Sequence, residues 1–155
     1  MQIRLYILTG MVCLAAAAHA QQPVAWTYTA KPIGTHLYEI HVTAKIDAGW
    51  HIYSGHQPKT AVAVPTSISF TADHLLAFKR TKEEGQVIHY KDKKAGIAQD
   101  QYANKVDFIR VVKLKASGKT RISGSITYQA CTDHECLPPV SNTFNVEISP
   151  AENSK

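Results

Sequence analysis

The chain has 155 residues, of which 45% are hydrophobic and 19% charged, with 17 Lys and Arg against 12 Asp and Glu. This length fits one globular domain, and the hydrophobic fraction is too high for a disordered chain. With 8 Gly, 7 Pro and no heptad pattern, the collagen, coiled-coil and low-complexity classes are excluded. One compact, mildly basic domain is therefore expected.

The first 20 residues have the pattern of a secretory signal peptide. Arg4 supplies the early positive charge, Leu5–Ala18 is an almost uncharged apolar run, and Ala18-His19-Ala20 is a small-x-small cleavage pattern. The apolar run is shorter than a membrane span, and no later stretch is long and apolar enough to cross a bilayer. We therefore predict cleavage near Ala20, a periplasmic or otherwise exported location, and a single domain over residues 21–155 that does not itself span the membrane.

The exported part is predicted to consist of short β-strands. In His36–Ile46 apolar and polar residues alternate, as expected for a strand with one buried face. Its apolar positions are Tyr38, Ile40, Val42, Ala44 and Ile46. The other predicted strands are Trp26–Ala30, Trp50–Tyr53, Thr66–Thr71, Val87–Tyr90, Lys105–Lys115, Arg121–Ala130 and Thr143–Ile148. About eight short strands separated by turn residues favour an all-β fold, an immunoglobulin-like sandwich of antiparallel strands.

The middle of the chain is the most polar part. Lys79–Gln101 is predicted to form long loops around one short strand, and Thr71–Arg80 is given at most one short helical turn. The basic residues here are interrupted by acidic ones, which is typical of solvated loops, so nucleic-acid binding is not expected. These basic residues are Lys79, Arg80, Lys82, Lys91, Lys93 and Lys94.

Two cysteines, Cys131 and Cys136, remain once Cys13 leaves with the signal peptide. An even number of cysteines in an oxidising compartment predicts a disulfide. The alternating segment Gly124–Ala130 delivers Cys131 at the end of a strand, and the four residues that follow must turn the chain back. Pro138-Pro139 then prevents continuation as a helix or central strand.

The pair has three possible roles. It could be a structural bridge in a non-catalytic interaction module, where so short a ring stabilises the fold by about 2 kcal/mol. It could be a redox-active disulfide that needs no further cofactor. Asp133 and Glu135 flank the sulfurs and oppose thiolate formation, which favours a disulfide attacked by a partner's thiolate over a self-activated nucleophile.

The third role is a zinc or copper site. Cys131, His134 and Cys136 are all potential ligands, but no second Cys/His pair follows at zinc-knuckle spacing. Further ligands would have to come from elsewhere in the fold, and the candidates are His51, His56 and His89.

The cysteine segment resembles a known family. Residues 126–139 read Ile-Thr-Tyr-Gln-Ala-Cys-Thr-Asp-His-Glu-Cys-Leu-Pro-Pro. This run is similar to the active-site segment of the N-terminal periplasmic domain of the thiol:disulfide interchange protein DsbD, which is approximately Thr-Tyr-Gln-x-Cys, a short spacer and Cys-x-Pro-Pro. Gly49-Trp50-His51-Ile52-Tyr53 is similar to a Gly-aromatic-aromatic-aliphatic-Tyr strand of the same family. Because the order of the elements also agrees, the resemblance extends over most of the exported chain.

The resemblance implies a sandwich with the cysteine pair at one end. It also implies that the domain takes electrons from a membrane-embedded or thioredoxin-like donor on a separate chain and passes them to oxidised periplasmic proteins. Cys136 would form the mixed disulfide with the partner, and Cys131 would resolve it. Tyr53 corresponds to a tyrosine packed near the pair, and His51 replaces a second aromatic residue.

Other residues near the pair are weaker candidates. The family's cap loop corresponds to Lys82–Tyr90, which lacks an Asp-Glu-Phe-type tip, so Tyr90 or His89 would have to replace it. His134, if protonated, would favour a thiolate, although a solvated turn histidine is the simpler expectation. Tyr128 is expected first as a core aromatic residue.

Overall fold

The structure, a computed structural model, describes residues 22–71, 76–115 and 119–148, with only the backbone described at 76–80. The predicted signal peptide lies outside these ranges. No helix capable of spanning a bilayer is found within them. The strands of the described part are β1 (Val24–Gly34), β2 (Leu37–Ile46), β3 (His51–Tyr53), β4 (Ser67–Phe70), β5 (Leu76–Asp92), β6 (Ile97–Leu114), β7 (Thr120–Tyr128), β8 (Ala130–Cys131) and β9 (Val140–Ile148).

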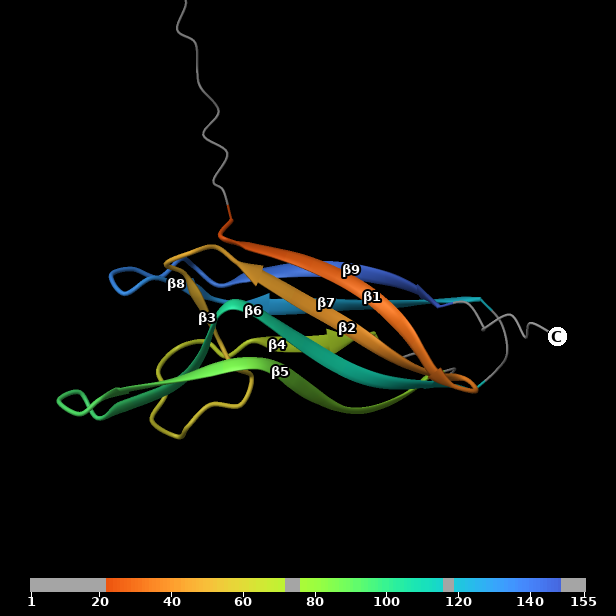
Figure 1. Cartoon of the computed structure of the whole chain (residues 1–155), viewed down its shortest axis with the longest axis horizontal. Helices are drawn as coiled ribbons and strands as arrows, with labels where there is room; N and C mark the ends of the chain where they lie inside the picture. The colour runs from red at the N-terminus through yellow and green to blue at the C-terminus, as the bar shows by residue number, and fades with distance from the viewer. Residues whose placement is uncertain (1–21, 72–75, 116–118, 149–155) are drawn as a thin grey trace, which may run out of the picture.

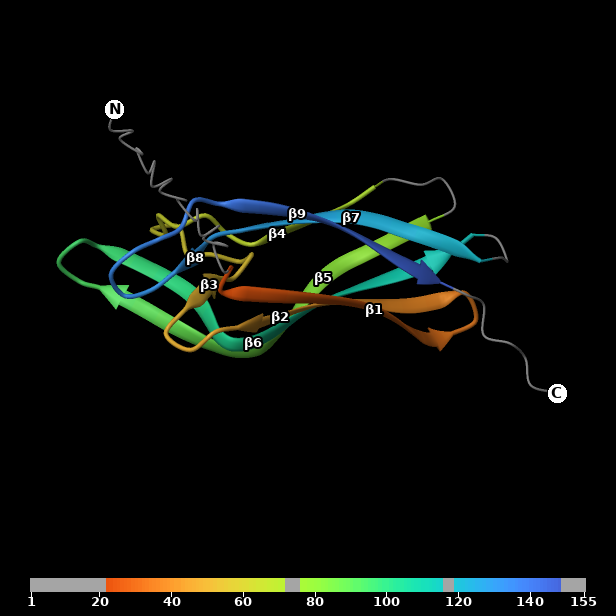
Figure 2. The same cartoon turned by 90° about the horizontal axis from the view of Figure 1, so that it is seen from above.

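The strands form two antiparallel sheets that lie one above the other (Figure 2). Sheet A has the order β1-β2-β6-β3-β8, with β5 also paired to β6, and sheet B has the order β4-β7-β9. The buried apolar side chains of both sheets form one core cluster. The predicted all-β, immunoglobulin-like antiparallel sandwich is confirmed.

Alternation along β2 explains how sheet A faces this core. Tyr38, Ile40, Val42, Ala44 and Ile46 are all at most 4% exposed, whereas the residues between them are half-buried or exposed. Fully burying a Val or Ile side chain stabilises a fold by about 1.5–3 kcal/mol, so this single strand is a large part of the core. The buried face that the sequence predicts for this strand is confirmed.

Strand β6 determines where the cysteine segment lies. Its C-terminal half pairs with β2, and its N-terminal half pairs with β3, at Ile52↔Tyr102 and Tyr53↔Gln101. Strand β8 then pairs with β3 at His51↔Cys131. The cysteine segment is therefore joined to sheet A at the end of the sandwich where the tip of the β5–β6 hairpin also lies (Figure 1).

In the polar middle of the chain, the short strand predicted at Val87–Tyr90 is confirmed as part of β5, but the long loops predicted around it are wrong. Lys79–Gln101 belongs to the long β5–β6 hairpin. Of Thr71–Arg80, where at most one short helical turn is expected, residues 72–75 lie outside the described ranges and the chain is strand from Leu76 onward. At the tip, the Asp92 carboxylate accepts hydrogen bonds from two backbone N–H groups of the turn, and Gly96 adopts a φ of 69°. Glu84–Lys91 is exposed on both faces, so outside Val87–Tyr90 the apolar alternation that marks a strand is missing there.

Candidate functional site

Cys131 and Cys136 form a disulfide, with 4.1 Å between their Cα atoms. Cys131 is the last residue of β8 and is 0% exposed. Cys136 lies in the connection to β9 and is exposed. The bridge therefore joins one sulfur-bearing residue fixed inside the sheet to another that an approaching molecule can reach.

The turn between the cysteines is held by hydrogen bonds that do not involve sulfur. The Thr132 N–H donates to the Glu135 carbonyl at 2.8 Å, and the Thr132 hydroxyl oxygen accepts from the backbone N–H groups of His134 and Glu135. Just outside the ring, the Leu137 N–H donates to the Ala130 carbonyl at 2.9 Å. These hydrogen bonds hold the turn independently of the bond between the two sulfurs.

A hollow of about 260 Å³ lies beside the disulfide. Residues directly opposite each other on neighbouring strands share a face of the sheet, so His51 lies on the same face as Cys131. By the same rule Tyr53 shares a face with Gln101, and Tyr90 with Gln99. The residues that line the hollow are His51, Tyr53, Tyr90, Gln99, Gln101, Thr132 and Asp133.

His51 is a titratable residue directly opposite Cys131 in the β3–β8 pairing. It is 9% exposed, its Nε2 atom is 3.2 Å from the Tyr53 hydroxyl, and the two rings meet edge to face. Burial lowers the pKa of His51, and the negative charge of Asp133 partly opposes this effect. His51 is therefore a neutral imidazole at neutral pH. Burial also raises the pKa of Tyr53, so its hydroxyl stays protonated.

Of the two candidates for a cap, the structure brings Tyr90 to the hollow. Tyr90 is 46% exposed and stands at its rim. His89 lies next to it in the strand and so points to the opposite face, where its Nδ1 atom is 2.6 Å from an Asp100 carboxylate oxygen. Glu83 is engaged elsewhere, with the loop that follows β3.

The remaining candidates lie away from the hollow or at its exposed margin. Tyr128 is 2% exposed, packs in the core against Trp26 and donates a hydrogen bond to Gln22. His134 is exposed at the turn between the cysteines. Within the described ranges, no three His, Cys, Asp or Glu side chains gather as a metal site would require. His56, one of the distant candidate ligands, is instead paired with Glu83.

Three lining residues, Gln99, Gln101 and Thr132, are not indicated by the sequence. The two glutamines fall in the segment that the sequence predicts as loop, and their convergence with Tyr53 depends on strand pairing across β6. The role of Thr132 in the turn could have been found from the sequence, because Thr-x-x-Glu is a common pattern for a side chain that accepts hydrogen bonds from the turn that follows it.

A family model described as the N-terminal part of the thiol:disulfide interchange protein DsbD matches residues 17–148. The sequence matches no curated protein. The solved structures that are similar to the fold include the following three. The reduced DsbD N-terminal domain of Neisseria meningitidis is 18% identical with a TM-score of 0.49, and the match covers 72% of this chain and 81% of that one.

The second solved structure is the N-terminal periplasmic domain of ScsB from Proteus mirabilis, which is 19% identical with a TM-score of 0.52. The match covers 79% of this chain but only 44% of that one. The third is a complex between the DsbD and PilB N-terminal domains of Neisseria meningitidis, with 14% identity, a TM-score of 0.54 and coverage of 88% and 95%. The second and third structures agree with the sandwich described above.

Proposed function

Because the chain belongs to the family of N-terminal domains of the thiol:disulfide interchange protein DsbD, we propose that it is a thiol–disulfide exchange module that carries reducing equivalents through the Cys131–Cys136 pair. The observation that carries this proposal is the asymmetry of the disulfide, with Cys131 buried in a strand and Cys136 exposed in a turn that other bonds hold. A purely structural bridge has no need of an exposed residue.

The exchange has two steps. A thiolate of a reduced partner attacks the Cys136 sulfur, the bond between the two sulfurs breaks, and the electron pair leaves with Cys131 as a thiolate that then takes up a proton. The second thiol of the partner attacks the mixed disulfide and releases Cys136 as a thiol. The partner ends as a disulfide and the domain as a dithiol, and the reverse sequence passes the electrons to an oxidised protein.

The partners that fit this chemistry are thioredoxin-like proteins with two neighbouring cysteines, and a membrane-embedded donor on a separate chain. The complex of the DsbD and PilB N-terminal domains is a precedent for docking of a related domain on a second protein. The amino-terminal pattern of residues 1–20 and the periplasmic origin of the ScsB relative support a periplasmic location for this chain.

Redox titration tests whether the disulfide exchanges. The pair is expected to equilibrate with thiol buffers at a potential above about −300 mV, the value below which structural bridges usually lie. The reduced form should stay folded and lose only about 2 kcal/mol of its free energy of unfolding, because the ring is short. Alkylation of the two thiols at each potential, with circular dichroism in parallel, measures both quantities. Unfolding coincident with reduction would identify a structural bridge instead.

We further propose that His51 assists Cys131 as the leaving sulfur. A thiolate formed at a fully buried position is costly unless a hydrogen-bond donor or a proton lies nearby. His51 is opposite Cys131 in the β3–β8 ladder, and the groups facing its ring are Tyr53, Asp133 and, across the hollow, Tyr90. A ring N–H of His51 can stabilise the Cys131 thiolate, and Asp133 can stabilise the imidazolium formed when a proton is shared.

Replacing His51 with Phe is therefore expected to raise the pKa of the Cys131 thiol by about one unit, the usual effect of losing one nearby favourable interaction. The thiol is titrated by absorbance at 240 nm in a Cys136→Ala background, so that a single cysteine is observed. His134→Phe is the matched control, because this exposed turn histidine should leave the titration unchanged. Equal pKa values for Cys131 with and without the His51 ring would contradict the proposed role.

A further inference from the structure

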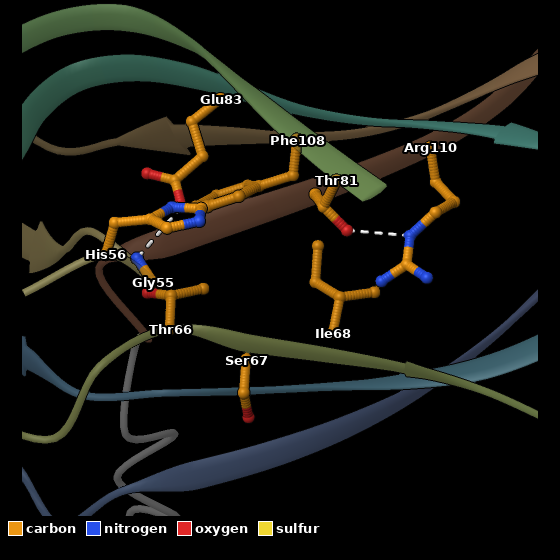
Figure 3. Close-up of a pocket in the computed structure, with 9 residues that line it drawn as sticks. All are labelled: Gly55, His56, Thr66, Ser67, Ile68, Thr81, Glu83, Phe108 and Arg110. Atoms are coloured by element: carbon orange, nitrogen blue, oxygen red, sulfur yellow. Dashed lines mark hydrogen bonds and ion pairs between the residues drawn. The ribbon is translucent and has the colours of Figure 1, made fainter. Parts of the chain in front are cut away.

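A second, larger hollow of about 410 Å³ lies between the two sheets, on the side where β4 and β5 form their edges (Figure 3). Strands β5 and β6 pair at Thr81↔Arg110 and Glu83↔Phe108, so these four side chains share one face. Because all four residues line the hollow between the two sheets, the face that they share is the inner face of sheet A. The interior of a sandwich is normally apolar, so an arginine and a glutamate on an inner face are unusual.

Arg110 is held in place but has no acidic partner in the part of the chain that the structure describes. Its Nε–H donates to the Thr81 hydroxyl at 2.7 Å, and its guanidinium carbon lies 5.0 Å from the centre of the Phe70 ring. Among the described residues no carboxylate forms an ion pair with it. Burial lowers the pKa of Arg110, so the fold bears a desolvation cost here without a compensating charge. In Figure 3 the guanidinium extends from β6 into the hollow toward Ile68.

The acidic residue at the other end of the hollow is already satisfied. Glu83 accepts hydrogen bonds from the Gly55 N–H and the Ser54 and Tyr102 hydroxyls, and its Oε1 atom is 2.9 Å from the His56 Nδ1 atom. It is therefore not available to pair with a cationic ligand. Its negative charge instead disfavours a second anionic group at this end.

Between the two charged ends the lining is mixed, with the apolar side chains of Phe108 and Ile68 beside the hydroxyl-bearing residues Thr66, Ser67 and Thr81. Phe108 lies between them on the sheet A side, and Ile68 faces it from β4 (Figure 3). A guanidinium whose Nε is already engaged presents its two terminal nitrogens as a planar fork, the geometry that matches a carboxylate. The volume falls within the range of about 300–1,000 Å³ that is usual for small-molecule sites.

We propose that this hollow binds a small organic monocarboxylate, with the acid group on the Arg110 fork and an apolar body along Phe108 and Ile68. The site is separate from the hollow beside the disulfide, and its occupation does not depend on the redox reaction. A dicarboxylate binds more weakly than a monocarboxylate of the same length, because its second charge approaches Glu83.

The test uses 3-phenylpropionate as the probe on the intact oxidised protein labelled with ¹⁵N. Saturable shifts are expected in the Gly55 amide and the Arg110 Nε–H signals. The uncharged 3-phenylpropionamide should not produce them, because it lacks the carboxylate. Arg110→Gln should weaken binding by about tenfold or more, as expected for the loss of charge-assisted hydrogen bonds. Arg110→Lys, which keeps the charge but not the fork, should weaken it less.

Two control variants establish whether the effect is specific to Arg110 and independent of the disulfide. Arg121→Gln makes the same charge change at an exposed arginine paired with Glu147 and should leave the affinity unchanged. A Cys131→Ala/Cys136→Ala variant should bind as tightly as the parent, so failure of the exchange function does not affect this result. The proposal is overturned if the amide binds as well as the acid, if Arg110→Gln and Arg121→Gln behave alike, or if no saturable shift appears.

Discussion

Replacing Cys131 with alanine is expected to turn the domain into a trap for its redox partners. The variant keeps the exposed Cys136 as a free thiol but lacks the sulfur that would release a bound partner. It should form a stable mixed disulfide with a thioredoxin that carries one active-site cysteine activated as its thionitrobenzoate disulfide. Attack by Cys136 releases one thionitrobenzoate anion per mixed disulfide, so absorbance at 412 nm and a non-reducing gel follow the reaction.

The reciprocal variant, Cys136→Ala, should react far more slowly. Its remaining thiol at Cys131 is 0% exposed and anchored in the β3–β8 pairing. If exposing this sulfur requires local opening that costs about 3 kcal/mol, the rate falls by about 100-fold. In denaturing urea the two variants should react equally fast, which verifies that both thiols are intact. Similar rates for the two folded variants would refute the assignment of Cys136 as the attacked sulfur.

The sequence predicted best those parts of the fold in which one face of a strand meets the core. The alternation in β2 appears in the structure as alternating burial, because each buried side chain leaves a polar neighbour on the outer face. The cysteine pair was equally informative, since export and an even cysteine count already indicated the bridge that the structure contains.

The β5–β6 hairpin could not be predicted in the same way, because its outer part contacts little of the core. Glu84–Lys91 is exposed on both faces, so the sequence indicates only the short strand Val87–Tyr90 there and not the long hairpin that contains it. Its strands are held by backbone pairing to one another, and the Asp92 turn closes them. The lining of both hollows follows from this pairing, so Gln99 and Arg110 could not be predicted from the sequence, and Tyr90 could be named only through the family resemblance.

Glu83 shows how a polar residue can stabilise the sandwich while lining its interior. Its side chain is only 8% exposed, and it ties β5 to the loop that directly follows β3. A buried carboxylate is tolerated when donors surround it, and removing it leaves those donors unpaired. Burial, followed by the charge of Glu83, raises the pKa of Tyr102 to about 12. The neutral Tyr102 thus contributes stability below about pH 10 that is lost as the pH rises toward about 12.

Glu83→Ala is therefore expected to lower the free energy of unfolding by about 3 kcal/mol, the usual cost of breaking a buried charged network. It should also lower the pKa of Tyr102, because one cause of its elevation is removed. Glu84→Ala is the matched control: the neighbouring carboxylate is 51% exposed and pairs with the exposed Lys82, so little change is expected. Urea unfolding and absorbance at 295 nm during alkaline titration measure the two effects.

Glu83→Gln adds a case that retains the shape of the side chain. The amide oxygen can still accept hydrogen bonds from two of the donors, but the amide nitrogen cannot accept from the others. The free energy of unfolding should therefore fall by less than in Glu83→Ala and by more than in Glu84→Ala. Ser54 directly follows Tyr53, the last residue of β3. Loss of its hydrogen bond to Glu83 should therefore also make β3 more mobile beside the disulfide. Equal stabilities for Glu83→Ala and Glu84→Ala would mean that the hydrogen bonds to Glu83 do not hold this side of the sandwich together.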